Sequence, residues 1–320
     1  MKKIDDFKKY YTKVNGTLVL KGYAKSKVLF FALLQTLLQG IDKKSLEITR
    51  LSVENRIYKR LKKKNTQFIQ KQHYTQDLEH IHSKIIWTAW MQGEENAPDL
   101  VKKCLKSMRD NIKDREIIVI TEQNYSDYVS FPDYIIDKYK QGKITKTHFS
   151  DLLRIELLCK YGGTWLDSTV FVTELLKHHT FYLDSNLFLF QTLKPGVDGH
   201  CSSISSWMIT SCSNNNILLL TKNLLYNYWK SNDFLIDYFL LHYFFQMSLE
   251  TYAEEWKNVV PISNEIPHIL LLRLNEEYNE EIWNNTKYIT PFHKLSYKID
   301  ESIFNDNTNY FSKILKDYKW

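Results

Sequence analysis

The sequence predicts an α/β protein in which helices flank a mostly parallel central sheet, preceded by a basic helical segment. From residue 84 onward, short β-rich runs alternate with segments of helical period, the order typical of a parallel sheet covered by helices. Apolar residues make up 43% of the 320-residue chain, enough to bury the core of one or two domains. We predict a basic helical module over residues 1–81 and an α/β domain over residues 82–320.

The first 80 residues carry most of the positive charge. They hold 18 Lys and Arg against 7 Asp and Glu, whereas the remaining 240 residues hold 25 against 30. Within them, residues 28–41 form an apolar run of 14 residues, too short for the roughly 20 that span a bilayer. Two interpretations stay open for this run: a buried helix of a small helical hairpin, or a helix on an anionic membrane surface.

A second basic feature is the segment 56–64, in which six of nine residues are Lys or Arg. Such a run is usually the solvated face of a helix, and an anionic surface as partner is the alternative. The chain has no zinc-ligand spacing, no RNP-like pattern and no Gly-rich nucleic-acid loop. We therefore predict that nucleic acid is not a partner.

Strands and helices are expected in alternation along the second part. The expected strands are 84–89, 116–121, 164–172, 187–191 and 206–209, and the expected helices are 98–110, 133–140, 147–161, 215–229 and 233–248. The run at 116–121 is continuously apolar, so we expect this strand to be covered on both faces.

Cysteine usage and the first residues bear on the compartment. The four cysteines show no CxxC spacing and stand in apolar or mixed surroundings, so buried reduced thiols and a reducing compartment are predicted. Residues 1–10 are charged, and no apolar segment with a small-residue cleavage site follows promptly. We therefore expect no signal peptide.

The segment 148–173 carries the chemistry. Asp151 and Arg154 stand three apart on a predicted helix and are therefore neighbours on one face. Gly162 lies where a helix end favours positive φ, and Gly163 lets the chain turn directly into a strand.

Asp167, Ser168 and Thr169 interrupt that otherwise apolar strand. Burying an unpaired carboxylate is costly, so the strand should break here unless the carboxylate is paired or binds a cation. We expect Asp167 to emerge at the crevice beside the sheet, where open α/β sheets bind ligands.

These residues resemble a known signature. The strings SDLLR, KYGG and WLD between residues 150 and 167 look like the signature of GT-A-fold sugar transferases, specifically the capsular polysaccharide synthesis family, which is related to families with an Asp-x-Asp sugar-binding motif. Supporting segments are KIIWTAWMQG (84–93), SISSWMI (203–209), DYFLLHYFF (237–245) and PFHKLSYK (291–298), so the resemblance covers roughly residues 82–298. It implies a GT-A-like domain.

The resemblance also implies roles for single residues. Trp87 would pack against the nucleobase of a nucleotide-sugar donor, and Asp151 and Arg154 would hold the donor's hydroxyls and diphosphate. Gly163 and Ser168 would belong to the same donor site.

A metal is implied in the same way. Asp167, with His293 as a further ligand, would bind Mn²⁺ or Mg²⁺, which would stabilise the leaving nucleoside diphosphate as a Lewis acid. Thr169 stands where the motif has its second carboxylate, so metal binding should be weaker. The alternative is a metal-independent site in which Arg154 and Lys294 neutralise the diphosphate.

The predicted reaction moves a hexose from a nucleotide sugar, UDP-linked, to a hydroxyl of a capsule-type acceptor that is lipid-linked, with retention of anomeric configuration. Asp237 is a candidate to orient the attacking hydroxyl, and a solvated helix start is its alternative role. The chain would act in the cytoplasm, at the inner face of the cytoplasmic membrane if residues 1–81 bind anionic lipid. The rival is a catalytically inactive nucleotide-sugar or glycan-binding protein, because the second carboxylate is missing.

Overall fold

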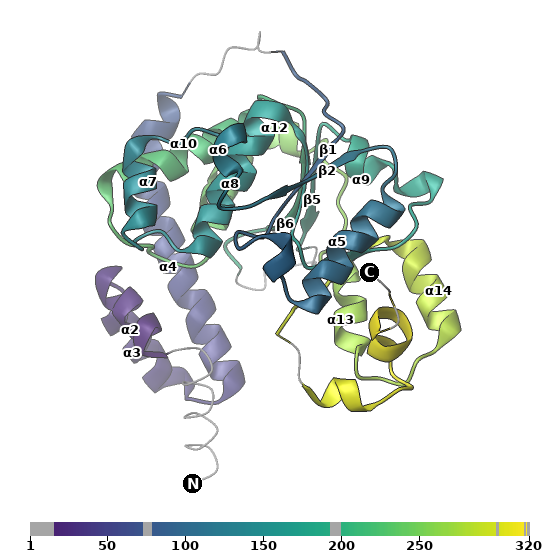
Figure 1. Ribbon diagram of the computed structural model, residues 1–320. Helices are drawn as coiled ribbons and strands as arrows, with labels where there is room; N and C mark the ends of the chain where they lie inside the picture. Colours follow the sequence, from purple (N-terminus) through teal and green to yellow (C-terminus); the bar gives the residue numbers. More distant parts are fainter. Residues whose placement is uncertain (1–15, 73–78, 193–199, 299–300, 317, 319–320) are drawn as a thin grey trace.

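The computed structural model describes residues 16–72, 79–192, 200–298, 301–316 and 318. Its first part consists of helices α2 (Gly16–Lys25), α3 (Leu29–Gln39) and α4 (Lys43–Gln70). Asp42 caps α4, because its Oδ1 accepts hydrogen bonds from the backbone N–H groups of Lys44 and Ser45. In Figure 1, α2 and α3 lie along α4 on the side away from the sheet.

A five-stranded sheet forms the centre of the second part, in the order β2-β1-β3-β6-β5. Its strands are β1 (Ile85–Ala89), β2 (Glu116–Ile120), β3 (Gly163–Leu166), β5 (Leu187–Gln191) and β6 (Ile204–Ser211). β1 pairs in parallel with β2 and β3, whereas β6 is antiparallel to both β3 and β5. β5 therefore points the same way as the first three strands, and the predicted, mostly parallel α/β sheet is confirmed.

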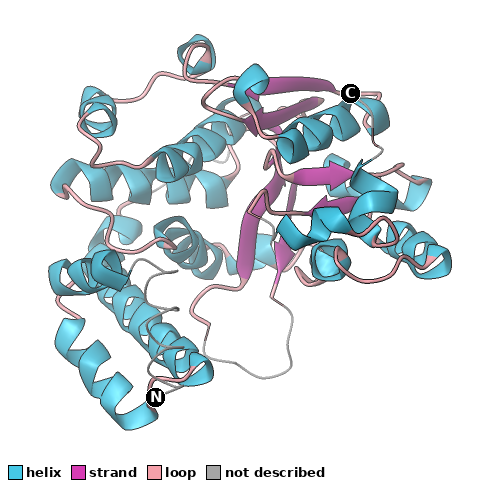
Figure 2. Ribbon diagram, turned by 60° about the horizontal axis from the view of Figure 1, so that its bottom comes forward, coloured by secondary structure: helices cyan, strands magenta, loops and turns pink. Residues whose placement is uncertain are grey.

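Helices cover both faces of this sheet (Figure 2). Alternate residues of β1 show the two faces: Trp87 packs in the core that contains α8 (Lys146–Tyr161), α10 (Asn216–Ser231) and α11 (Leu240–Thr251). Ile86 packs in the core that contains α5 (Asp99–Asn111). This period of two is what a strand with helices on both sides requires.

The remaining elements are shorter. The other helices are α6 (Tyr125–Tyr128), α7 (Asp133–Lys140), α9 (Phe181–Asp184), α12 (Ala253–Trp256), α13 (Ile269–Arg273) and α14 (Glu280–Ile289). Short 3₁₀ segments lie at Glu94–Asn96, Lys177–His179, Ile266–His268 and Glu301–Asn305, and a π-helical segment at Phe311–Lys316.

The strand predicted at 164–172 is broken as expected. After β3, the backbone N–H of Asp167 still bonds to the Trp207 carbonyl (2.8 Å), and a turn follows in which Val170 N–H bonds to the Asp167 carbonyl (3.0 Å). β4 (Val170–Val172) then leaves the main sheet and pairs antiparallel with β7 (Phe292–Lys294).

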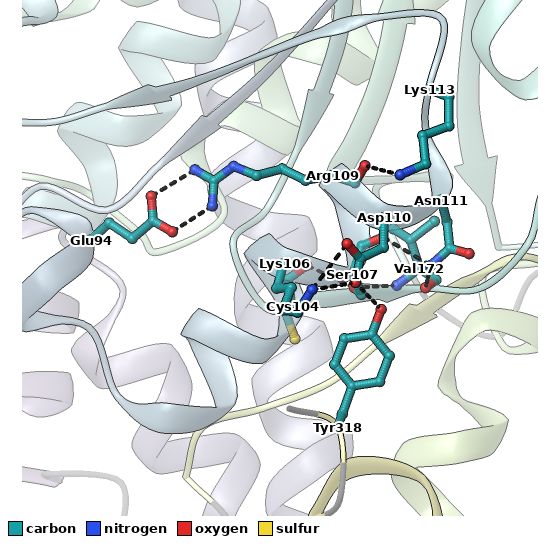
Figure 3. Close-up of polar contacts among 10 residues, drawn as sticks. All are labelled: Glu94, Cys104, Lys106, Ser107, Arg109, Asp110, Asn111, Lys113, Val172 and Tyr318. Atoms are coloured by element: carbon teal, nitrogen blue, oxygen red, sulfur yellow. Dashed lines mark hydrogen bonds and ion pairs between the residues drawn. The ribbon is translucent and has the colours of Figure 1, made fainter. Parts of the chain in front are cut away.

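α5 fixes the position of β4. The Ser107 hydroxyl accepts a hydrogen bond from the Val172 N–H (2.9 Å), and the Asn111 amide donates one to the Val172 carbonyl (3.0 Å). Figure 3 shows both contacts at the end of α5. Since β7 pairs with β4, α5 indirectly holds β7 beside the break after β3.

The GlyGly turn has the predicted conformation, with φ of +70° at Gly162 and +96° at Gly163. A Cβ on Gly162 would lie 2.7 Å from the Ile81 carbonyl oxygen, and one on Gly163 would lie 2.5 Å from that of Ile85. Both positions therefore require glycine for conformation and for space.

Two predictions about elements were wrong, and one of the two open interpretations of residues 28–41 holds only in part. β2 is only partly buried, because it lies at an edge of the sheet and not between two strands. The helix expected at 233–248 begins only at Leu240. The apolar run 28–41 is helical, but Ala32 is the only residue of α3 that is buried, so the buried-hairpin interpretation fails for its outer face.

All four cysteines are free, and Cys104, Cys159 and Cys212 are buried, as predicted. Among the described residues, no helix combines the length and the apolar character needed to cross a membrane.

Candidate active site

Asp167 is the carboxylate at the carboxyl end of β3, and it lies between two cations. Its Oδ1 is 3.4 Å from Arg154 Nη2 and its Oδ2 is 3.3 Å from Lys294 Nζ. The Trp165 indole N–H also donates to Oδ1 (3.0 Å). Burial acts to raise the pKa of Asp167, but Lys294 and Arg154 outweigh it, so that the pKa lies below its usual range. The carboxylate is therefore ionised at neutral pH.

Arg154 is held rigidly from α8. Its Nη1 donates to the carbonyl of Ser206 (2.6 Å) and to the hydroxyl of the same residue (3.1 Å). Its guanidinium lies 4.9 Å from the Trp165 ring centre, within range of a cation–π contact. Nη2 is 3.4 Å from Asp151 Oδ1 as well as near Asp167, so one side of the guanidinium bridges two carboxylates.

A buried chain of contacts stands behind Arg154. The Trp229 indole donates to His148 Nε2 (2.9 Å), and His148 Nδ1 is 3.1 Å from Asp151 Oδ2. Because an indole N–H only donates, Nε2 must accept, so neutral His148 carries its proton on Nδ1 and donates it to Asp151. His148 therefore fixes the carboxylate that positions Arg154.

Lys294 reaches the same place from β7. Its ammonium donates to the Thr169 hydroxyl (2.6 Å) and lies 3.3 Å from Asp167 Oδ2. It thus bridges positions 167 and 169, where an Asp-x-Asp motif would supply two carboxylates.

The predicted metal ligands do not come together. His293 precedes Lys294 on β7, so the two side chains point to opposite faces. The His293 ring is fully buried, with its centre 4.9 Å from that of Trp283, and this burial lowers its pKa to about 3. Over the part of the chain that is described, no three His, Cys, Asp or Glu side chains are grouped so as to hold a metal. This donor set does not fit a cation bound by Asp167 and His293.

Two of the residues that were predicted to contact the nucleotide-sugar donor lie where they can only support the fold. Trp87 is 1% exposed, its indole N–H bonds to the Gly162 carbonyl (2.9 Å), and its ring contacts Tyr128 and Tyr161, so it has no free face for a base. Gly163 begins β3, at the opposite end from Asp167. Ser168 is buried directly beside Asp167.

Asp237 faces the helical module and not Asp167. Its Oδ1 accepts from the Phe239 N–H (2.8 Å) just before α11. Burial raises the pKa of Asp237. The carboxyl group interacts electrostatically with Arg50 and Glu54, which both belong to α4. The predicted role in orienting an acceptor hydroxyl gains no support from this position.

Four aromatic residues lie near the site, and three of them had no predicted role: Tyr238, Trp90 and Tyr297. The charges of Asp151, Arg154 and Asp167 act on both Tyr238 and His242, which are four residues apart. Tyr238 is 65% exposed, and His242 Nδ1 is a buried atom with no hydrogen-bond partner among the described residues.

The other two are Trp90 and Tyr297. Trp90 directly follows β1 at the same sheet edge, and its ring centre is 5.7 Å from that of the half-exposed Tyr297. The signal for Trp90 was available in the sequence, since it is the second Trp of KIIWTAW and stands after the strand.

The chain is thus an α/β protein in which Asp167, Arg154 and Lys294 form a charged cluster at the carboxyl edge of a mostly parallel sheet. The chain belongs to the capsular polysaccharide synthesis protein family, whose model matches residues 39–314. The match confirms the resemblance found in the sequence and supports a glycosyltransferase. It begins within the predicted helical module and includes α4.

Other comparisons add little. A solved structure described as PaToxG Glycosyltransferase is 15% identical over 64% of this chain and 80% of its own, with a TM-score of 0.37, too low to support an argument. No curated protein matches the chain.

Proposed function

We propose that the chain transfers a hexose from a UDP-sugar to a hydroxyl group of a capsule-type glycan. The observation that carries the proposal is the Arg154–Asp167–Lys294 cluster at the carboxyl edge of the sheet, in which Arg154 is buried and Asp167 and Lys294 are partly exposed. Asp151 and Asp167 hold Arg154 and Lys294 in place as two fixed cations, and guanidinium and ammonium groups are the side chains that bind diphosphate oxygens. Family membership supports the transfer of sugar.

In this proposal Arg154 and Lys294 neutralise the diphosphate. The bond between the sugar C1 and the diphosphate oxygen breaks, and its electron pair stays on that oxygen, where the two cations stabilise it. The acceptor oxygen bonds to C1 on the same face, and its proton passes to the departing diphosphate, so that configuration is retained. Asp167, already ionised, accepts a hydrogen bond from a sugar hydroxyl. No step of this proposal uses a metal, because Asp167 and His293 lie on different faces and do not form a shared ligand set.

Aromatic contacts with the donor come from the rim of the site. We assign to Trp90 and Tyr297 the role that the sequence gave to Trp87, because they lie at the carboxyl edge and Tyr297 is exposed. Trp90 Nε1 is buried and has no hydrogen-bond partner among the described residues, so Tyr297 offers the exposed aromatic face of this pair.

We further propose that the acceptor is lipid-linked and that the reaction takes place at the inner face of the cytoplasmic membrane. The basic character of the first 80 residues supports this location.

The test is a thermal-shift screen of UDP-sugars, followed by measurement of UDP release. We expect a UDP-sugar to raise Tm and UDP to be released slowly, both in EDTA and with Mn²⁺. Asp167→Ala and Lys294→Ala should remove the shift. A shift without UDP release in the presence of acceptor glycan would identify an inactive binding protein, and a shift only with Mn²⁺ would restore the metal prediction.

A further inference from the structure

The outer face of α3 is apolar and uncovered. Five apolar side chains share this face of the helix, with exposed fractions from 42% to 82%: Phe30, Leu33, Leu34, Leu37 and Leu38. No charged residue interrupts α3 from Leu29 to Gln39. A continuous exposed apolar face of this kind marks a surface that contacts another apolar phase or a partner.

A basic cavity of about 510 Å³ lies between α3 and α4, at the border of this face. Phe31 lines it from α3, three residues before Leu34. From α4 the lining side chains follow a single stripe, and four of them are cations: Arg56, Lys59, Arg60 and Lys63.

Within the described residues, these cations have no carboxylate to neutralise them. Arg56 lies over the Phe31 ring at 4.5 Å, and Arg60 donates to the carbonyls of Ser26 (3.0 Å) and Lys27 (2.9 Å). Among the described residues none of the four forms an ion pair, whereas Lys62 in the same run pairs with Glu250 across the interface with α11. The cavity therefore gathers positive charge and leaves it available to an anion.

We propose that α3 lies on an anionic phospholipid surface, with its apolar face among the acyl chains and a lipid phosphate in the cavity between α3 and α4. An apolar face beside an unneutralised basic cavity matches the two parts of such a lipid. A second copy of this chain would bring a second set of cations to the same place and would be repelled. In Figure 1, α3 lies on the side of α4 that faces away from the sheet. The inference deepens the proposed membrane location and does not depend on sugar transfer.

Co-sedimentation of the full chain tests this, with vesicles of phosphatidylglycerol and phosphatidylcholine in equal parts and with vesicles of phosphatidylcholine alone. We expect binding to the anionic vesicles to be at least about tenfold stronger. Lys59→Glu/Lys63→Glu should lower that binding about tenfold or more, because each reversed charge opposes the anionic surface. Leu37→Gln/Leu38→Gln should lower it as well, by removing exposed apolar side chains.

The matched control is Lys140→Glu/Lys230→Glu, which makes the same charge change at exposed lysines of α7 and α10. It should keep vesicle binding within about twofold. Equal binding to both kinds of vesicle, or an equal loss in the cavity variant and the control, would overturn the proposal. So would a Leu37→Gln/Leu38→Gln chain that changes from dimer to monomer while keeping its vesicle binding. UDP release in solution is measured separately, so failure of the transferase proposal leaves the vesicle result intact.

Discussion

Cations cluster both at the carboxyl edge of the sheet and in the α3–α4 module, but the two clusters differ in whether carboxylates pair with the cations. At the edge, Arg154 and Lys294 lie within 3.4 Å of carboxylate oxygens and are held by further contacts. In the module, Arg56, Lys59 and Lys63 have no ion-pair partner among the described residues. Cations fixed by carboxylates give a rigid site of defined geometry, whereas unpaired and exposed cations suit a fluid, repetitive anionic surface.

We expect the largest loss of stability from a substitution of Arg154, which pairs with two carboxylates at the sheet edge. Arg154→Met leaves the buried Asp151 and the partly exposed Asp167 without their shared cation, and we expect the free energy of unfolding to fall by about 3 kcal/mol in urea denaturation. The control is Arg109→Met, which removes the Arg109 contacts to Glu94 at 2.6 and 2.7 Å (Figure 3). That pair is solvent-exposed and should cost about 1 kcal/mol or less. Equal losses in the two variants would mean that the edge cluster is no tighter than a surface pair.

Lys294→Met should affect function more than folding. Removing a cation that stabilises the departing diphosphate should lower UDP release by about 100-fold or more. Lys287→Met serves as the comparison, because Lys287 lies over Trp283 and away from Asp167, and it should keep its rate. A Lys294→Met rate close to that of the unaltered chain would remove Lys294 from the proposed mechanism.

The same variant should shift the acid limit of stability. Asp167 has a pKa below its ordinary 3.8, so its contribution is fully present above that value and is lost only as the pH falls through the lower folded pKa. Without Lys294, the first of the lowering influences, the folded pKa rises. Acid unfolding followed by circular dichroism should therefore begin at higher pH in Lys294→Met than in Lys287→Met.

The smallest effect is expected in the module. Lys59→Glu/Lys63→Glu breaks no ion pair within the described residues, so the free energy of unfolding should change by no more than about 0.5 kcal/mol. UDP release in solution should also be unchanged. A large loss of stability would show that these lysines have structural partners, and the contrast between the two regions would disappear.

Much of the fold was predictable because its strands are short and strongly apolar. The break at Asp167 followed from the cost of burying an unpaired carboxylate, and the GlyGly turn followed from backbone sterics. The site was harder, since adjacent residues on a strand point to opposite faces. That alternation places Lys294 and His293 on opposite faces of β7. Trp87 lies within β1, whereas Trp90 follows the last residue of the strand and therefore lies at the carboxyl edge.

Other features depend on tertiary packing alone. His242 is far from Asp167 in sequence, and only the packing of α11 against α10 and β6 brings it near. The apolar run of α3 was visible in the sequence, but which of its faces α4 covers was not.

The pairing of β7 with β4 has a consequence for biosynthesis. Lys294 comes from a strand made more than one hundred residues after Asp167, yet it completes the cation pair around that carboxylate. A nascent chain can present Asp167 and Arg154 well before β7 has left the ribosome. Under the proposed mechanism, donor binding waits for the C-terminal segment, and we expect a growing or truncated chain that lacks β7 not to consume nucleotide sugar.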